Sequence, residues 1–263
     1  MSVFVGVPVK NCAYWLPRFL QLLDKLDDIS RVVISYGESN DPTLDVITQW
    51  MTVTEHEVEL YREPRGMKAE SSAQIGAIVR DFQQLVDEGN ERYALLPDSD
   101  IVKMPRNLIQ KLVKYDKDII APYIWIKNYV PPRFYDTYGF RFKGYRFHPF
   151  NPPMNNNELI KLDSAGTCVL IKRRPFLEVP YRDIHPHLNF CRDARVQGYE
   201  VWADPKTTVE HLDLTRLGIY HFPFNVPGTS PEVTAFIKDD GSLITEDQLD
   251  EEMGKILVWG ATS

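Results

Sequence analysis

Two aspartates separated by one residue, Asp98 and Asp100, directly follow a short apolar run at residues 93–96. In an extended segment, residues two apart project to the same side, so both carboxylates can face one cation. Hard oxygen ligands suit Mg²⁺ or Mn²⁺, and such an ion neutralises the charge on a departing diphosphate. The alternative interpretation is a solvated turn that caps the next helix.

The elements that must position this pair alternate between strands and helices. Apolar runs predict strands at residues 3–9, 31–36, 57–61, 93–96 and 118–125, with helical spacing between them. This order predicts an α/β fold with a mostly parallel central sheet flanked by helices. Open parallel sheets bind ligands beyond the carboxyl ends of their strands, which is where Asp98 and Asp100 stand.

Helix starts and later elements are also predicted from local signals. Asp41 followed by Pro42 is typical of an N-cap and a first helical residue, and Pro105 is expected to begin another helix. In the second half of the chain we expect strands at 166–172 and 201–203 and a helix at 188–196.

Composition restricts the class of protein. The chain has 263 residues, 43% of them hydrophobic, and a net charge of -7, which argues against broad coating of nucleic acid. Cys12, Cys168 and Cys191 are too few and too scattered for a disulfide framework, so free thiols are expected. The N-terminus lacks a basic stretch before its apolar run, and residues 119–126 are too short to span a bilayer. We therefore expect a soluble, cytoplasmic protein with no transmembrane segment.

The segment 127–150 interleaves cations with aromatic residues. Aromatic faces stack on sugars or on extruded bases while cations bind phosphate, so this segment is a candidate acceptor surface. The alternative is a hairpin whose alternate aromatics belong to the core, which the alternation at 138–142 favours. Its cations and aromatic residues are Lys127, Tyr129, Arg133, Phe134, Tyr135, Tyr138, Phe140, Arg141, Phe142, Lys143, Tyr145, Arg146 and Phe147.

Four sequence runs together resemble the GT-A glycosyltransferases. The run ALLPDSDIVKMPRNLIQKLVKYDKDIIAPYIW (94–125) resembles the metal-site region of fungal mannan-polymerase α-1,6-mannosyltransferases and of shorter family-2-like bacterial and phage enzymes. VGVPVKN (5–11) and SYGESNDPT (35–43) resemble the nucleotide-facing strand ends, and LNFCRDARVQGYEVWADPKTTVEHL (188–212) resembles the acceptor-side helix and terminal histidine. Together the matches run from about residue 3 to residue 212, and their order and spacing make the resemblance specific.

The resemblance implies a domain organisation and a set of site residues. A GT-A domain is expected at 1–227, with a nucleotide-sugar half at 1–126 and an acceptor half at 127–227, followed by an acidic extension at 228–263. The residues expected to contact the nucleotide of the donor are Pro8, Val9, Lys10, Glu38 and Asp41. Asp98 and Asp100 would hold ribose and metal, and His211 stands where the family often has a third metal ligand, although a lone histidine is otherwise often structural.

The catalytic base is left open by the sequence. Many inverting relatives have an acidic pair before the acceptor-side helix, but this chain has Pro186-His187 there. His187 has a suitable ordinary pKa for accepting a proton. Asp193, Asp183 or Asp163 are alternatives, or the enzyme retains configuration and needs no base. Gly166 would let the backbone approach a sugar or diphosphate closely, unless it belongs to an ordinary turn.

These observations predict a transferase that uses a UDP- or GDP-sugar and Mn²⁺ or Mg²⁺. The acceptor would be a hydroxyl of a glycan, a lipid-linked sugar or a modified nucleic-acid base. Two rival functions are a nucleotidyltransferase, for which Gly6-Val7-Pro8-Val9-Lys10 is a poor phosphate loop, and a non-catalytic sugar-binding module on the same fold.

Overall fold

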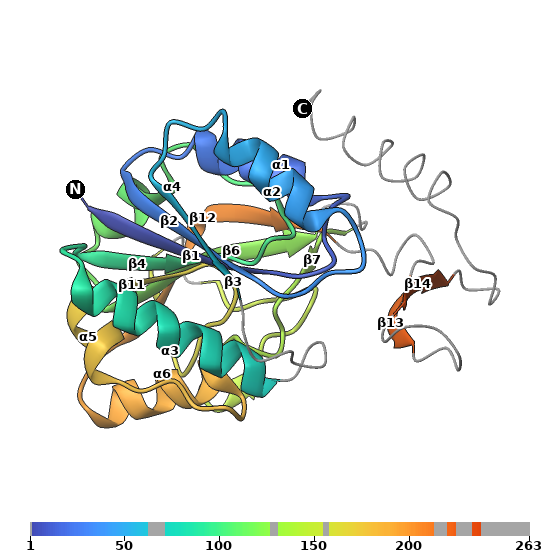
Figure 1. The fold of residues 1–263 in the computed structure, drawn as a ribbon. Coiled ribbons are helices and arrows are strands. Elements are labelled where there is room, and N and C mark those ends of the chain that lie inside the picture. The colour runs from blue at the N-terminus through green and yellow to red at the C-terminus, as the bar shows by residue number, and fades with distance from the viewer. Residues whose placement is uncertain are drawn as a thin grey trace.

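A twisted ten-stranded sheet runs through the computed structural model (Figure 1). The structure describes residues 2–62, 72–126, 131–154, 158–212, 220–224 and 233–237. The strands of this sheet are β1 Val3–Val9, β2 Ile29–Tyr36, β3 Val58–Arg62, β4 Tyr93–Leu96, β5 Ile101–Lys103, β6 Ile119–Ile126, β7 Arg133–Phe134, β10 Ile160–Leu162, β11 Val169–Lys172 and β12 Val201–His211.

The strand order is β10-β12-β6-β11-β4-β1-β2-β3, with β5 on the far end of β12 and β7 on β6. The three longest ladders, β1–β2, β12–β6 and β2–β3, are parallel, and β11 runs antiparallel between β4 and β6. The predicted mostly parallel α/β sheet is thus confirmed. Strands buried on both faces, such as β1 and β4, are continuous apolar runs for this reason.

Helices cover both faces of the sheet. Figure 1 shows α1, α2 and α4 on one side and α3, α5 and α6 on the other. Their bounds are α1 Leu16–Asp24, α2 Thr43–Met51, α3 Ser72–Glu88, α4 Leu108–Val113, α5 Arg173–Glu178 and α6 Pro186–Val196. The apolar spacing that predicted α1 places Leu16, Phe19 and Leu23 in the core, each 0% exposed.

Two smaller pairs of strands lie outside the main sheet. A short hairpin joins β8 Arg141–Phe142 to β9 Tyr145–Arg146. The strands β13 Tyr220–Phe224 and β14 Val233–Ile237 pair with each other. Apart from β14, the predicted extension at 228–263 lies outside the described residues. No helix in the described part of the chain is both long and apolar enough to cross a membrane.

Several predicted boundaries are wrong for identifiable reasons. Helix α2 begins at Thr43, because the Asp41 carboxylate accepts the Thr43 N–H at 3.1 Å and Pro42 occupies the N-cap. Helix α4 begins at Leu108 rather than at Pro105. Strand β11 begins at Val169, three residues later than predicted, since Thr167 and Cys168 have positive φ (29° and 60°).

Strand β12 and two short elements also differ from the prediction. β12 is eleven residues long rather than three, because a bulge after Asp204 interrupts its register with β6 without ending it. The Asp204 carboxylate holds this bulge by accepting bonds from Lys206 N–H and Thr207 O–H. Strand β10 and helix α5 were not predicted, since each has too few residues to show a period.

Candidate active site

Asp98, Asp100 and His211 converge at the end of the sheet. The two aspartates occupy the turn between β4 and β5, and His211 ends β12, which pairs with β5. Each residue offers one ligand atom, and these atoms lie within 4.8 Å of one another. His211 Nε2 is 2.7 Å from Asp100 Oδ1 and 4.0 Å from Asp98 Oδ2. Strand pairing therefore brings together residues more than a hundred positions apart.

Asp98 and Asp100 do not lie in an extended segment, contrary to the expectation from the sequence. The segment forms a tight turn in which Ile101 N–H approaches the Asp98 carbonyl at 3.4 Å. The Asp100 carbonyl accepts a hydrogen bond from Leu212 N–H at 2.9 Å, which fixes the turn beside the end of β12. The two carboxylates still reach one point in space, but the turn and β12 bring them there rather than the alternation of a strand.

The donor set fits a divalent cation. His211 Nδ1 lies 2.5 Å from the Leu212 carbonyl, which can only accept, so Nδ1 carries the ring proton. The buried atoms His211 Nε2 and Asp100 Oδ1 then face each other without a hydrogen-bond partner. Two such atoms repel unless a proton or a cation lies between them, and an imidazole nitrogen with two carboxylates suits Mn²⁺ or Mg²⁺.

Electrostatics in the cluster are strongly perturbed. Burial and the neighbouring Asp100 carboxylate raise the pKa of Asp98 to about 6. Burial lowers the pKa of His211, but the carboxylates of Asp100 and Asp98 outweigh this effect and raise it. Such coupled groups concentrate at functional sites.

Tyr135 supports the histidine and was not singled out by the sequence. Its ring stacks on His211 with centroids 3.4 Å apart and 15° between the planes. The Tyr135 N–H bonds to the Ile124 carbonyl at 2.9 Å, which anchors this residue to β6. No sequence signal pairs residues 135 and 211, because their contact depends on the order of strands in the sheet.

Asp136 is a second residue that sequence reasoning missed. Its carboxylate accepts the Gly139 N–H at 2.6 Å and the Thr167 O–H at 3.3 Å, and burial raises its pKa. A Cβ on Gly139 or on Gly166 would overlap this carboxylate. A glycine is therefore needed at position 166 to leave room for the Asp136 carboxylate. This is a structural reason for Gly166, in addition to the donor contact expected from the sequence.

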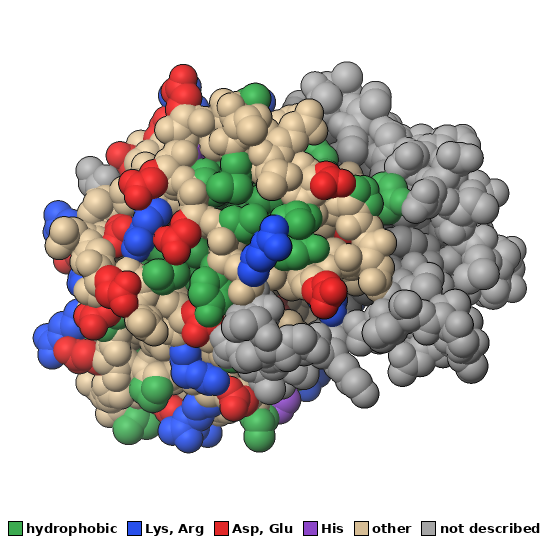
Figure 2. Space-filling model, in the orientation of Figure 1, with side chains coloured by type: hydrophobic (Ala, Val, Ile, Leu, Met, Phe, Trp, Pro, Cys, Tyr) green, Lys and Arg blue, Asp and Glu red, His purple; other side chains and the backbone are tan. Residues whose placement is uncertain are grey.

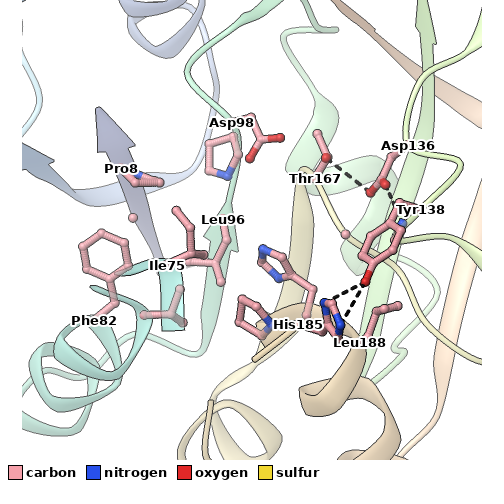
Figure 3. Close-up of a pocket in the computed structure, with 17 residues that line it drawn as sticks. Pro8, Ile75, Phe82, Leu96, Asp98, Asp136, Tyr138, Thr167, His185 and Leu188 are labelled. Carbon is pink, nitrogen blue, oxygen red and sulfur yellow. Dashed lines mark hydrogen bonds between the residues drawn. The ribbon is translucent and has the colours of Figure 1, made fainter. Parts of the chain in front are cut away.

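A pocket opens beside the cluster of Asp98, Asp100 and His211 (Figure 3). One wall is apolar and comes from β1, α3 and β4, and the other carries polar side chains from the 131–150 segment and the start of α6. Asp98 lies at its edge, so the pocket and the cluster are continuous. The main apolar lining residues are Pro8, Ile75, Val79, Phe82, Leu96 and Leu188, and the polar ones are Asp98, Asp136, Tyr138, Thr167, His185 and His187.

The residues predicted to contact the nucleotide follow two neighbouring parallel strands. Pro8 pairs with Ser35 and lines the pocket, and Val9 is buried, with its carbonyl bonded to Gly37 N–H at 2.9 Å. Lys10 packs against Gly37, and Glu38 is exposed.

Asp41 ties two loops together. Its carboxylate accepts bonds from Ala13 N–H (2.9 Å) and from Thr43 N–H and O–H. The same two loops are joined by Asn11, whose N–H bonds to Ser39 Oγ at 3.0 Å. Asp41 thus has a structural task that its sequence position did not reveal.

The candidate bases are separated by the fold. His187 lines the pocket, and burial lowers its pKa to about 4. Asp193 is held in ion pairs by Arg182 (2.7 Å) and Arg192 (2.9 Å). The other two candidates, Asp163 and Asp183, pair with Arg195 at 3.2 Å and with Arg80 at 2.7 Å, and neither lines the pocket.

The aromatic segment is partly core and partly surface. Phe134, Phe140 and Phe147 pack edge-on or tilted on one another and are at most 3% exposed, which confirms the core alternative for these rings. Tyr138 and Tyr145 remain exposed (40% and 78%). Lys127 and Tyr129 lie outside the described residues.

Comparisons with known proteins agree with this architecture. A sequence model of Anp1, a mannosyltransferase family, matches residues 82–141, a minority of the chain that includes Asp98, Asp100 and Asp136. A search of curated protein sequences finds no significant match.

Solved structures share the fold at low sequence identity. S. aureus TarS aligns with a TM-score of 0.55 and 11% identity over 81% of this chain and 37% of TarS. GalNAc-T7 with UDP, GalNAc and Mn²⁺ aligns with a TM-score of 0.60 and 14% identity over 81% of this chain and 44% of its own. A mycobacterial protein aligns with a TM-score of 0.52 and 10% identity over 89% and 82%. The chain thus spans less than half of TarS or GalNAc-T7, and within that span it has the GT-A fold of these glycosyltransferases.

Proposed function

We propose that this protein is a metal-dependent glycosyltransferase that moves a sugar from a UDP- or GDP-sugar to an acceptor hydroxyl. The observation that carries the proposal is the cluster of Asp98, Asp100 and His211 at the edge of a pocket on a GT-A fold. The Anp1 match supports glycosyl transfer, and GalNAc-T7 is a relative in fold whose structure contains UDP and Mn²⁺.

Asp98, Asp100 and His211 would hold Mn²⁺ or Mg²⁺ in this proposal. The ion would neutralise the charge that develops on the departing diphosphate. The protein's part is to fix the ligands in advance: the Leu212 carbonyl sets the His211 tautomer, and the Tyr135 ring sets the plane of the imidazole.

The donor would lie between the ends of β1 and β2 and the polar wall of the pocket. Pro8, Val9, Lys10 and Glu38 are proposed to contact base and ribose, with Asp41 holding the two loops in place. The backbone at Gly166, beside the Asp136 carboxylate, is proposed to face the sugar.

His187 is proposed to accept the hydrogen of the acceptor hydroxyl. Of the four candidate bases, His187, Asp163, Asp183 and Asp193, it is the only one that lines the pocket. Its low pKa keeps the ring neutral at neutral pH, so a ring nitrogen is free to accept a proton, and it also makes His187 a weaker base than an ordinary histidine. We expect His187→Ala to lower the kcat of donor turnover about 10²-fold. A loss of less than tenfold would assign it to acceptor binding or to the start of α6.

The metal assignment is tested with Asp100→Asn, which keeps the shape of the side chain but removes its charge. We expect Mn²⁺-stimulated hydrolysis of UDP- or GDP-sugars, measured as released nucleoside diphosphate, to fall at least 10²-fold, with the far-UV circular dichroism unchanged. The matched control is Asp116→Asn, whose carboxylate is 84% exposed and pairs with Lys172. Equal turnover in Asp100→Asn and Asp116→Asn would remove the metal site from the mechanism.

A further inference from the structure

Two arginines face each other across the hairpin that follows the pocket residues Tyr138 and Gly139. Arg141 in β8 is directly opposite Arg146 in β9. The hairpin turns at Lys143 and Gly144, both with positive φ (51° and 83°), the geometry of a tight two-residue loop. Like charges directly opposite in a strand pair are destabilising, so this pairing has a cost in the isolated protein.

Acidic side chains do not offset this charge. Within the described ranges, no carboxylate forms an ion pair with Arg141, Arg146 or Lys143. The Asp163 carboxylate accepts the Gly144 N–H of the hairpin at 2.6 Å and is already paired with Arg195. Elsewhere, acidic and basic side chains are interspersed, as Figure 2 shows for one face of the molecule.

Both guanidinium groups instead lie near one aromatic ring. The Cζ atoms of Arg141 and Arg146 are 5.7 Å and 4.9 Å from the centre of the Tyr138 ring. The Tyr138 hydroxyl bonds to His185 Nδ1 at 2.6 Å, and Tyr138 and His185 both line the pocket (Figure 3). The two guanidinium groups thus lie beside Tyr138, a residue of the polar wall of the pocket.

Strain at His185 points to the same location. This residue precedes α6 in the left-handed conformation (φ 47°, ψ 59°), and its side chain does not cap the helix. A non-glycine residue in this region costs free energy, and such residues cluster at binding sites. The hydrogen bond to Tyr138 holds the imidazole beside the arginines instead.

We propose that Arg141 and Arg146, with Tyr138 and His185, form a subsite for a phosphate group of the acceptor. The subsite rests on the proposed function, because it specifies the acceptor as a phosphate-bearing molecule. A phosphate between the two guanidinium groups would relieve their repulsion and accept paired N–H bonds from them. The donor's diphosphate is a second source of phosphate, and the experiment separates the two.

The test compares Arg141→Gln/Arg146→Gln with the control Lys25→Gln/Lys114→Gln, which removes the same charge from two exposed positions. The probe is end-labelled inorganic polyphosphate, and binding is followed by fluorescence anisotropy between 50 and 200 mM salt. We expect the arginine variant to bind at least tenfold more weakly at low salt, with a salt slope smaller by about one for each cation removed. The control should keep most of the affinity. Arg141→Lys/Arg146→Lys should keep the salt slope but lose part of the affinity, because lysine cannot donate paired N–H bonds.

Two further readings decide between the alternatives. Donor hydrolysis with Mn²⁺ should be unchanged in the arginine variant, and its Tm should equal or exceed that of the native chain because a repulsive pair is gone. A parallel loss of donor hydrolysis would assign the arginines to the donor and overturn the subsite, as would unchanged polyphosphate binding. Failure of the proposed function looks different: the native chain itself would show no metal-dependent donor turnover.

Discussion

At the scale of single residues, burial decides which predicted groups can act in the pocket. His187 and Asp193 lie on the same helix, but His187 lines the pocket and Asp193 is locked between two arginines. Burial lowers the pKa of His187 to about 4, whereas hydrogen bonds and charge from Arg192 and Arg182 outweigh partial burial and lower that of Asp193. One side chain is neutral and the other ionised at neutral pH, for opposite reasons.

The half-buried histidine His187 makes folding stability depend on pH. The pKa of His187 falls from 6.5 to about 4 on folding, so between these pH values the unfolded chain binds a proton that the folded chain does not. Its contribution is full above pH 6.5 and is lost as the pH falls toward 4. At pH 5 the loss is about 2 kcal/mol.

Urea unfolding at pH 7.5 and pH 5 measures this effect. His187→Gln should lose less stability between the two pH values than the native chain, and His148→Gln, at an exposed position, should behave like the native chain. An identical pH dependence in all three proteins would contradict the burial of His187.

At the scale of elements, the position of α6 depends on how closely α3 approaches the loop before it. Gly76 in α3 lies against the backbone of Arg182 and Asp183, and Arg80 bonds to the Tyr181 carbonyl at 3.0 Å. This contact sets where α6 begins and hence where His185 and His187 stand. Helix α3 lines the apolar wall of the pocket, and through this contact it also positions the polar side chains at the start of α6.

Gly76→Ala tests this contact. A Cβ at this position would overlap the Arg182 carbonyl oxygen, so we expect a loss of about 1–3 kcal/mol in unfolding free energy, despite a gain of about 1 kcal/mol from helix propensity. Gln84→Ala, at an exposed position of the same helix, should be neutral or slightly stabilising. A Gly76→Ala protein as stable as the Gln84→Ala protein would show that α3 and the loop are not in tight contact.

At the scale of the whole molecule, one sheet joins the two predicted halves. Strand β4 of the first half pairs with β11 of the second, and the cluster takes its ligands from both. A donor bound with Mn²⁺ would therefore contact both halves and should stabilise the folded chain as a unit.

Thermal unfolding with UDP, GDP and their sugar conjugates measures this coupling. At a ligand concentration of 100 Kd the stabilisation is about 2.7 kcal/mol, which corresponds to roughly 5–10 °C in Tm for a chain of this size. The shift should need Mn²⁺ and should be selective for one of the two bases. Equal shifts with EDTA and with Mn²⁺ would show that nucleotide binding does not depend on a metal held by Asp98, Asp100 and His211.

The sequence by itself determined the main strands of the sheet and the candidate metal ligands. Strands β1 and β4 have the predicted bounds, because continuous apolar runs are a local signal. Asp98 and Asp100 were identified by residue type and spacing, and His211 by the resemblance to the GT-A family. The tertiary structure alone decided which other groups join them. It stacks the Tyr135 ring on His211 and places the Asp136 carboxylate against Gly166. It also holds Asp193 in an ion pair with Arg182, away from the pocket. These contacts link residues from different strands and loops, and their meeting depends on strand order and burial, which no local period in the chain encodes.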